Sequence, residues 1–220
     1  MRVWGDSLTR GNVVVSEMRR RGHAVLLKRE GRTRFYRLIS PLDFLFAFLY
    51  LAGLGQVRAE AYKPIIVKAV RSLKAGFGPG LIAVGLFGSV ARGAASRTSD
   101  VDLYVVAEWK TRRLPERLDE VLPLLGAVDQ ERSLMLQDGF STDVSIYPAS
   151  REDAARFSPL QLDLSNEGIV LYDTQGFLEE NWTRLRVWLS QKGVRRVEAG
   201  NGWFWQIDPE VEVGSAIEIR

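Results

Sequence analysis

The residues best suited to chemistry lie in one short stretch, GLFGSVARGAASRTSDVDLYVV, at positions 85–106. A glycine-serine turn, Gly88-Ser89, follows an apolar run, and two aspartates, Asp100 and Asp102, open the next one. Side chains two apart on a strand point to the same face, so we expect both carboxylates to lie side by side. Two such carboxylates repel each other at neutral pH unless a cation lies between them. The spacing therefore predicts a metal site built from oxygen ligands, the kind that magnesium prefers.

The turn before the aspartates has the features of a phosphate site. A strand that ends at Gly88-Ser89 and turns into a short helix exposes unpaired backbone N–H groups at the helix start, where a phosphate binds well. Gly88 lets the backbone come close, Ser89 adds a hydroxyl group, and Arg92 adds a charged donor for a terminal phosphate. A phosphate site that faces a magnesium site indicates binding of a nucleoside triphosphate.

The same residues resemble the signature of a known superfamily. The runs Gly88–Ala95 and Ser99–Leu103 are similar to those of the polymerase-beta-like nucleotidyltransferases, and within them to the minimal nucleotidyltransferases. The resemblance covers roughly residues 76–173 of the chain. It implies an enzyme whose nucleotide-binding residues are Gly88, Ser89, Arg92 and Ser99.

The resemblance also implies a third carboxylate on a neighbouring strand. Asp143, which opens the alternating stretch DVSIYP, is the candidate, and Asp129 is the alternative. The implied catalytic residues, which are also the implied ligands of two Mg²⁺ ions, are then Asp100, Asp102 and Asp143. The implied reaction is an in-line displacement at the α-phosphorus of a nucleoside triphosphate, with ATP as the expected substrate and Asp143 as a possible general base.

The transferred nucleoside monophosphate is expected to be AMP, and the sequence indicates only the class of its acceptor. A protein or a small molecule fits better than a polynucleotide, because residues 41–220 carry a net charge of −4, which opposes a polyanion. The resemblance to the antitoxin half of toxin–antitoxin pairs implies a HEPN-type helical protein as a partner.

The basic start of the chain suggests a different role. Residues 1–40 carry 10 Lys/Arg and 3 Asp/Glu, a balance of +7 in a chain whose net charge is +3. A helix over 12–21 and a hairpin around Gly31 resemble the second half of a winged helix-turn-helix domain, which gives the alternative function, a DNA-binding regulator or antitoxin-like protein. The competing interpretation is a basic hairpin docked on the body. Val13–Val15 beside Phe35 and Tyr36 would suit a homodimer surface.

The remaining pattern predicts an α/β or α+β fold, in which helices flank a mixed sheet. We expect buried strands at 81–87, 100–106 and 168–172, a hairpin formed by 127–137 and 142–147, and helices at 41–54, 57–74, 114–125, 151–156, 159–166 and 176–191. A last hairpin contains VRRVEAG and GWFWQID.

The expected division of the chain follows from these elements. It comprises a partial winged-helix-like segment (1–40), a helical connector (41–75), the nucleotidyltransferase domain (76–175) and a C-terminal helix with a β-hairpin (176–220). The apolar run 42–55 is shorter than the roughly 20 residues of a membrane-spanning helix, so we expect a buried helix there and a cytoplasmic protein. No cysteine is present, which excludes disulfides and thiolate chemistry.

Overall fold

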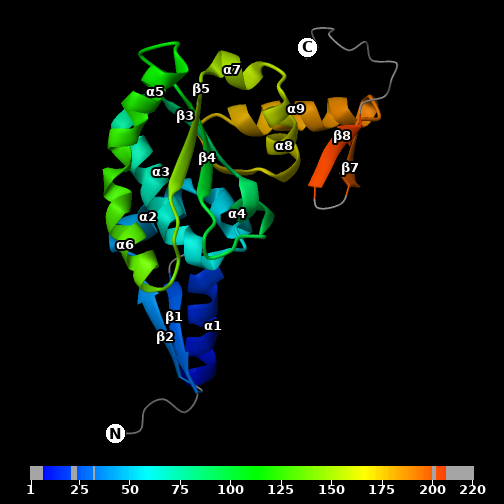
Figure 1. The fold of residues 1–220 in the computed structure, drawn as a ribbon. Helices are drawn as coiled ribbons and strands as arrows, with labels where there is room; N and C mark the ends of the chain where they lie inside the picture. Colours follow the sequence, from blue (N-terminus) through cyan, green and yellow to red (C-terminus); the bar gives the residue numbers. More distant parts are fainter. Residues whose placement is uncertain (1–6, 21–23, 32, 200–201, 207–220) are drawn as a thin grey trace, which may run out of the picture.

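A four-stranded mixed sheet forms the centre of the protein (Figure 1). The structure is a computed structural model, and it describes residues 7–20, 24–31, 33–199 and 202–206. The strands of the sheet stand in the order β5-β4-β3-β6. Their bounds are β3 Leu81–Phe87, β4 Val101–Ala107, β5 Val144–Ala149 and β6 Ile169–Asp173. Strand β3 pairs antiparallel with β4 and with β6, and β4 pairs parallel with β5. The predicted α/β class with a mixed sheet is confirmed.

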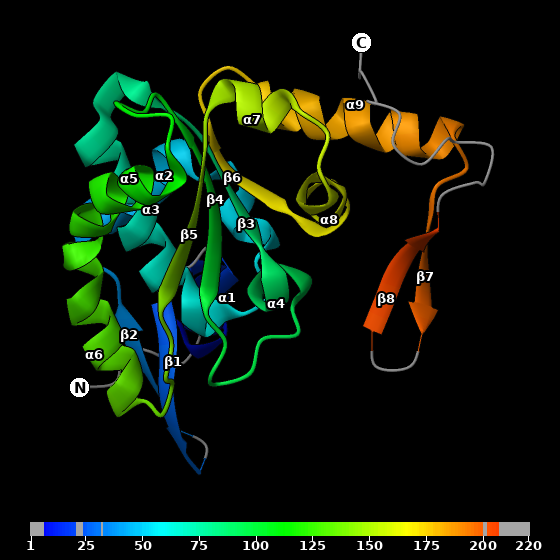
Figure 2. The ribbon, with the colours of Figure 1, turned by 45° about the horizontal axis from the view of Figure 1, so that its top comes forward.

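Each face of the sheet packs against helices, because alternate side chains of the strands point in opposite directions. Leu103 and Val105 of β4 join the larger core, which includes the buried face of α3 (Lys63–Phe77). Tyr104 and Val106 point to the other face, where Trp182 of α9 (Phe177–Gln191) completes a second core. Figure 2 shows α9 and α3 on opposite sides of the strands. The helical spacing predicted for α3 is confirmed by its buried residues Ile65, Ile66, Val70 and Leu73.

Short helices connect the strands. α4 (Gly88–Arg92) links β3 to β4, and α7 (Arg151–Ala155) and α8 (Pro159–Glu167) lead from β5 to β6. Between β4 and β5 the chain forms α5 (Leu114–Val121), a 3-10 segment (Leu122–Val128) and α6 (Asp129–Gln137). The long connection is what allows β5 to lie parallel to β4.

The hairpin predicted for 127–137 and 142–147 is wrong. Residues Asp129–Gln137 form helix α6, with two acidic residues in the first turn, where the helix dipole favours them. The apolar run Leu134–Leu136 suggested a strand, yet only Met135 of the three is buried. Strand β5 finds its partner in β4 instead.

The N-terminal segment docks on the body through ion pairs. It comprises α1 (Ser7–Arg20) and the antiparallel strands β1 (Ala24–Glu30) and β2 (Thr33–Leu38), as the sequence predicted, although helix α1 begins earlier than expected. Arg19 pairs with Glu60 at 2.6 Å, and Arg37 pairs with Glu131 of α6 at 2.6 Å. Two basic residues of this segment are therefore neutralised by the body of the protein.

The prediction of a buried helix at the apolar run after Pro41 is wrong. Helix α2 spans Pro41–Tyr50, and Phe46 is partly buried against the core. The other large side chains of the helix are exposed, namely Leu42, Phe44, Leu45, Phe48, Leu49 and Tyr50. Its buried residues are Asp43, which pairs with Arg71 of α3 at 2.7 Å, and Ala47. The helix turns its one acid inward because Arg71, whose side chain is itself 38% exposed, offers an ion-pair partner there, and this leaves most of its apolar side chains outward. Among the described helices, none is long and apolar enough to cross a membrane.

The C-terminal part follows the prediction within its described residues. Helix α9 and the antiparallel strands β7 (Arg195–Ala199) and β8 (Gly202–Gln206) lie where the sequence predicted them. Earlier in the chain, 3-10 turns at Ala52–Gln56 and Glu60–Tyr62 precede α3, which therefore starts later than predicted. Trp205 Nε1 donates to Asp163 Oδ1 at 2.9 Å, which fastens the β7–β8 hairpin to α8. Residues 200, 207 and 208 of the predicted hairpin lie outside the described residues. The division of the chain into four parts stays a prediction.

The buried carboxylate of Glu131 gives a test of the docked N-terminal segment. It faces Arg37 and also Lys68, at 3.7 Å, with a side chain only 1% exposed. Replacing it by alanine leaves two cations without their partner, so we expect Glu131→Ala to lower the free energy of unfolding by about 3–5 kcal/mol in urea titrations. The neighbouring exposed Gln130→Ala should change it by less than about 0.5 kcal/mol. Equal effects of the two substitutions would contradict the ion-pair assignment.

Candidate functional site

The two aspartates of the sequence motif lie together at the start of β4. Asp102 is the second residue of the strand and is half-buried, and Asp100 immediately precedes the strand and is exposed. Because they are two residues apart, both side chains belong to the face of the sheet that carries Tyr104. The Asp143 N–H donates to Asp100 Oδ1 at 3.0 Å, which joins the start of β5 to the start of β4.

Gly88 is the residue that lets the Asp102 carboxylate into this site. It follows Phe87, which stands opposite Asp102 in the sheet, and its φ of +72° lies in the left-handed region that favours glycine. A Cβ atom at position 88 would lie 2.1 Å from Asp102 Oδ2. The predicted close approach at Gly88 is thus made by a carboxylate of the site itself, and a larger residue would push that carboxylate away.

The pKa of the Asp102 carboxyl group is raised above its ordinary value. Burial is the largest cause, repulsion from Asp100 adds to it, and attraction to Arg92 opposes it. The attraction to Arg92 is therefore too weak to offset the burial of Asp102 and its repulsion from Asp100. The donors that meet here are carboxylate oxygens in a space kept open by a glycine, and such a donor set suits Mg²⁺. Asp100 and Asp102 fit the ion that the resemblance implies.

The backbone of Asp143, the expected third acid, contacts Asp100, but its carboxylate binds Arg132 instead of joining the other two acids. Asp143 Oδ2 accepts from Arg132 at 3.2 Å, and Oδ1 accepts from the Val144 N–H at 2.7 Å. Arg132 also binds Asp129, the alternative candidate, at 3.2 Å. Within the described ranges, no group of three or more His, Cys, Asp and Glu side chains is arranged to hold a metal ion. The structure brings Asp100 and Asp102 together and leaves the carboxylate of Asp143 on an arginine.

The predicted phosphate residues differ in what they contact. Among the described residues, the half-buried Ser89 side chain makes no hydrogen bond, so its hydroxyl group is available to a ligand. Arg92 binds Glu167 of α8 at 3.2 Å. Ser99 Oγ accepts from the Ser96 N–H at 2.9 Å and so shapes the loop before β4. Only Ser89 of these three side chains is unengaged.

Sequence reasoning missed the residues that engage the charged groups of the site. Glu167 and Arg132 lie on helices whose distance from the motif gives no signal in a single sequence. Arg196 of β7 also pairs with Glu167, so one carboxylate joins the C-terminal hairpin to α4. Tyr104 could have been found, since it continues the alternation that starts with Asp100 and Asp102.

Comparison with known proteins identifies the segment that holds the site. Residues 65–153 match the family model described as "Nucleotidyltransferase domain", and every candidate site residue lies within this range. No match was found among curated proteins.

Three solved structures with partial likeness have TM-scores below 0.5, too low to support an argument. One, "Crystal structure of the toxin-antitoxin with AMP-PNP", has a TM-score of 0.37 and 19% identity over 57% of this chain and 90% of that one. A mutant of the toxin-antitoxin MntA-HpeT has a TM-score of 0.35 and 21% identity over 56% of this chain and 90% of that one. A putative nucleotidyltransferase from Sulfolobus solfataricus has a TM-score of 0.27 and 21% identity over 48% of this chain and 84% of that one.

The conformation of Gly88 predicts a local cost for any side chain. We expect Gly88→Ala to lower the free energy of unfolding by about 1–2 kcal/mol, because alanine is strained at a positive φ. The matched control is Gly126→Ala, since Gly126 has no positive φ and no atom within 4 Å of an added Cβ. Denaturant unfolding of both variants measures the difference. An unchanged stability of Gly88→Ala would show that the turn adopts another conformation in solution.

The raised pKa of Asp102 predicts a stability that depends on pH. The folded protein binds this proton more tightly than the unfolded chain does, so ionisation of Asp102 destabilises the fold as the pH rises above the unfolded value of 3.8. We therefore expect Asp102→Asn to melt at a higher temperature than the wild type at pH 7 without divalent ions, with the gain vanishing as the pH falls below that value. Calorimetry measures it, with the exposed Asp119→Asn as control. A gain that stays constant with pH would contradict the assignment.

Proposed function

We propose that this chain transfers AMP from ATP to a hydroxyl group of a protein or small molecule. The chain is a nucleotidyltransferase of the polymerase-beta-like superfamily, and its nucleotidyltransferase domain lies at residues 65–153. The observation that carries this proposal is the arrangement of Gly88, Asp100 and Asp102. Asp100 and Asp102 lie at the start of β4, and the Asp102 carboxylate lies against Gly88, the first residue of the short helix α4, which has a positive φ.

The acids are proposed to hold two Mg²⁺ ions. Asp100 and Asp102 would share both ions, and Asp143 would join one of them after its carboxylate leaves Arg132. The rotation needed is local, since the Asp143 backbone already lies within hydrogen-bond reach of Asp100. Bound Mg²⁺ supplies positive charge that stabilises the entering and leaving oxygens of a phosphoryl transfer. This charge would also offset the burial and the repulsion from Asp100 that raise the pKa of Asp102.

The residues of the turn after β3 are proposed to bind the triphosphate. The Ser89 hydroxyl is unengaged among the described residues, whereas the space beside the Gly88 backbone is taken by Asp102 Oδ2. Arg92 would contact the terminal phosphate when it exchanges Glu167 for the more highly charged ligand. Ser99 would act by holding the loop before β4 in place, through its contact with Ser96.

The proposed reaction is a single displacement. The acceptor oxygen forms a bond to the α-phosphorus while the bond from that phosphorus to the pyrophosphate oxygen breaks on the opposite side. Asp143 is placed at the start of β5, exposed beside Asp100, and would accept the proton of the hydroxyl group. Pyrophosphate would leave toward Ser89 and Arg92.

The acceptor is proposed to be uncharged overall or only moderately charged. Residues 41–220 carry a net charge of −4, which disfavours a polynucleotide at this site. A helical protein of the HEPN type is one acceptor that fits the resemblance. A DNA-binding role of residues 1–40 finds less support, because Arg19 and Arg37 already pair with acids of the body.

Removing either central carboxylate should abolish the reaction. We expect Asp100→Ala and Asp102→Ala to lower the rate of label transfer from alpha-labelled ATP with Mg²⁺ by at least about 1,000-fold, since stabilisation of the transition state by bound metal is worth several kcal/mol. The assay follows label incorporated from each of the alpha-labelled triphosphates into the molecules of a cell extract. Asp119→Ala, on the exposed side of α5, is the matched control. A wild-type rate in either central variant would refute the site.

A further inference from the structure

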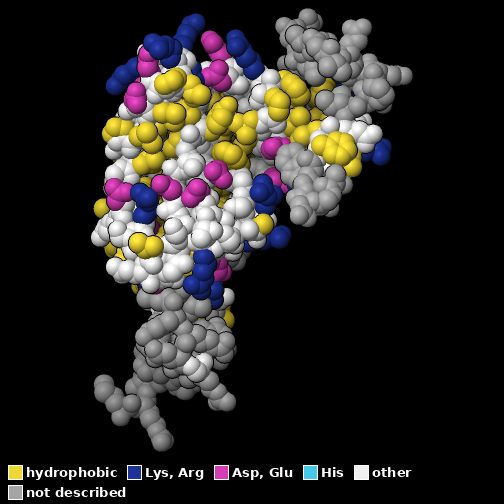
Figure 3. Space-filling view, in the orientation of Figure 1, with side chains coloured by type: hydrophobic (Ala, Val, Ile, Leu, Met, Phe, Trp, Pro, Cys, Tyr) yellow, Lys and Arg dark blue, Asp and Glu magenta, His cyan; other side chains and the backbone are white. Residues whose placement is uncertain are grey.

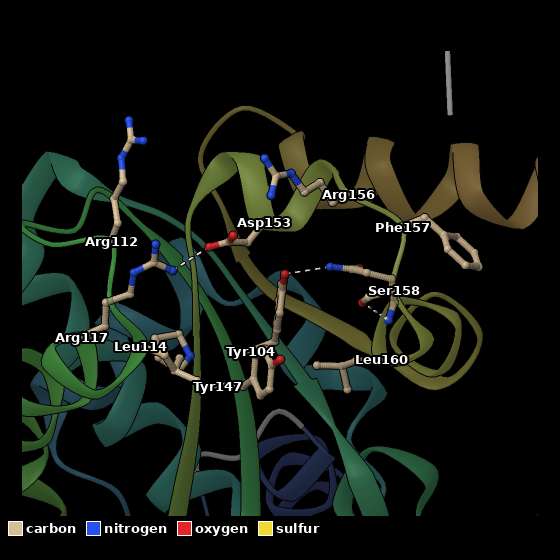
Figure 4. Close-up of a pocket in the computed structure, with 12 residues that line it drawn as sticks. Tyr104, Arg112, Leu114, Arg117, Tyr147, Asp153, Arg156, Phe157, Ser158 and Leu160 are labelled. Atoms are coloured by element: carbon tan, nitrogen blue, oxygen red, sulfur yellow. Dashed lines mark hydrogen bonds and ion pairs between the residues drawn. The ribbon is translucent and has the colours of Figure 1, made fainter. Parts of the chain in front are cut away.

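A cavity of about 360 Å³ lies over the sheet near the ends of β4 and β5 (Figure 4). Tyr104 and Tyr147 form its floor, and the start of α5 and the α7–α8 connection form its walls. Its size is that of a pocket for a small molecule. Arg117 and Gln161 line it as polar groups that are 6% and 4% exposed, so the cavity contains buried side chains held in fixed positions.

The cavity and the carboxylates share one face of the sheet. Tyr104 lies two residues after Asp102 on β4, a distance of about 7 Å along the strand. Ser145 pairs with Asp102 and Tyr147 pairs with Tyr104 across the parallel β4–β5 pair. Asp143, Ser145 and Tyr147 are exposed, whereas Val144 is buried, so an open track runs from the acids to the cavity. Figure 3 shows hydrophobic side chains gathered over this region, directly above a row of acidic ones.

The direction of this track matches the side from which an acceptor must enter. Helix α4 starts at the end of β3, opposite Asp102, and the cavity lies in the other direction along β4. In an in-line displacement the attacking and leaving oxygens lie on opposite sides of the phosphorus. If pyrophosphate leaves toward α4, the acceptor comes from the side of the cavity.

The floor of the cavity suits a planar ring. The rings of Tyr104 and Tyr147 stack with centroids 5.8 Å apart and an angle of 22°, and Tyr147 is 45% exposed. Gln161 Nε2 donates to the Tyr104 hydroxyl at 2.7 Å, which leaves the phenol proton of Tyr104 free to be donated to a ligand. Burial raises the pKa of Tyr104, so the phenol keeps this proton at neutral pH.

The charges of the cavity suit an anion. Arg117 and Asp153 neutralise each other at 2.6 Å. Arg112 and Arg156 also line the cavity, and within the part of the chain that the structure describes neither side chain makes a hydrogen bond or an ion pair. Figure 4 shows Arg156 beside Asp153 at the rim, while Arg112 extends outward. The charged groups of the lining therefore leave an excess of two positive charges.

We propose that this cavity is the acceptor site, and that the acceptor is a small hydroxyl compound in which an aromatic ring is joined to an anionic group. The ring would lie on Tyr147, the anion would bind Arg156, and the hydroxyl group would extend past Ser145 toward Asp102. The acceptor oxygen forms the new bond to the α-phosphorus, pyrophosphate leaves with the electrons of the broken bond, and the hydroxyl proton passes to Asp143. This inference rests on the proposed function and names the acceptor of that reaction.

A matched series of phenols tests the inference. The full-length protein is incubated with alpha-labelled ATP, Mg²⁺ and para-hydroxyphenylacetate, its neutral amide or the cationic tyramine. We expect kcat/KM for the anionic compound to exceed that of the other two by at least about tenfold, the effect of one charge-assisted hydrogen bond. Arg156→Gln should remove this preference by raising the KM of the anion, and Tyr147→Ser should raise the KM of all three. Arg113→Gln, an exposed neighbour outside the lining, is the charge-matched control.

Two outcomes would overturn the inference. One is the absence of a preference for the anionic compound, including the case in which no phenol is labelled. The other is a higher KM for ATP, instead of the acceptor, in Arg156→Gln or Tyr147→Ser, which would assign the cavity to the nucleoside. Release of pyrophosphate from ATP with water as acceptor separates the two levels. If this release occurs and depends on Asp100, the proposed function stands and only the acceptor site is wrong.

Discussion

The repulsion between two carboxylates at the start of β4 is the constraint on which the rest of the site depends. Asp102 is half-buried beside Asp100, and burial together with this repulsion raises its pKa, so its ionisation is less favourable in the folded protein than in the unfolded chain. The fold tolerates the pair because strand spacing fixes both side chains on one face and because Gly88 leaves room for an oxygen. Hydrophobic cores on both sides of the sheet supply the stability that such a site lacks.

Arginines partly neutralise the acids near this site. Arg132 binds Asp143, and Arg92 binds Glu167, so two groups expected to contact metal or phosphate are held by ion pairs on the protein surface. The Arg132–Asp143 pair joins two exposed side chains and is worth about 1 kcal/mol or less, so a multivalent ion can replace it at small cost. Glu167 is only 15% exposed, but it also pairs with Arg196 and so keeps a cationic partner when Arg92 turns to a triphosphate.

The parts of the fold that the sequence predicted are those governed by local patterns. The glycine-serine turn, the strand of Asp102 and the spacing of α3 each follow from neighbours within a few residues. The prediction of a strand where helix α6 lies was wrong because three consecutive apolar residues, Leu134–Leu136, fit a strand as well as a helix. Only the burial of Met135 in the folded protein distinguishes the two. The prediction that helix α2 is buried was wrong because it rested on hydrophobicity alone. The face that the helix turns inward is determined by the pairing of Asp43 with Arg71. The partners of Asp143 and Arg92 lie on other elements, which a single sequence does not bring together.

The strand order explains why acids and cavity open on the same side. In the order β5-β4-β3-β6, helices α8 and α9 pack against β3, and α9 also packs against β6, which covers that half of the face. The half over β5 is left open, since β5 is an edge strand on which Ser145 and Tyr147 stay exposed, as does Asp143 directly before it. The parallel pairing of β5 with β4 brings Ser145 level with Asp102 and Tyr147 level with Tyr104. The parallel pairing of β4 and β5 thus brings Asp143 beside Asp100 and also brings Tyr147 beside Tyr104 on the same open face. A molecule bound over Tyr147 can therefore reach the acids at the start of β4.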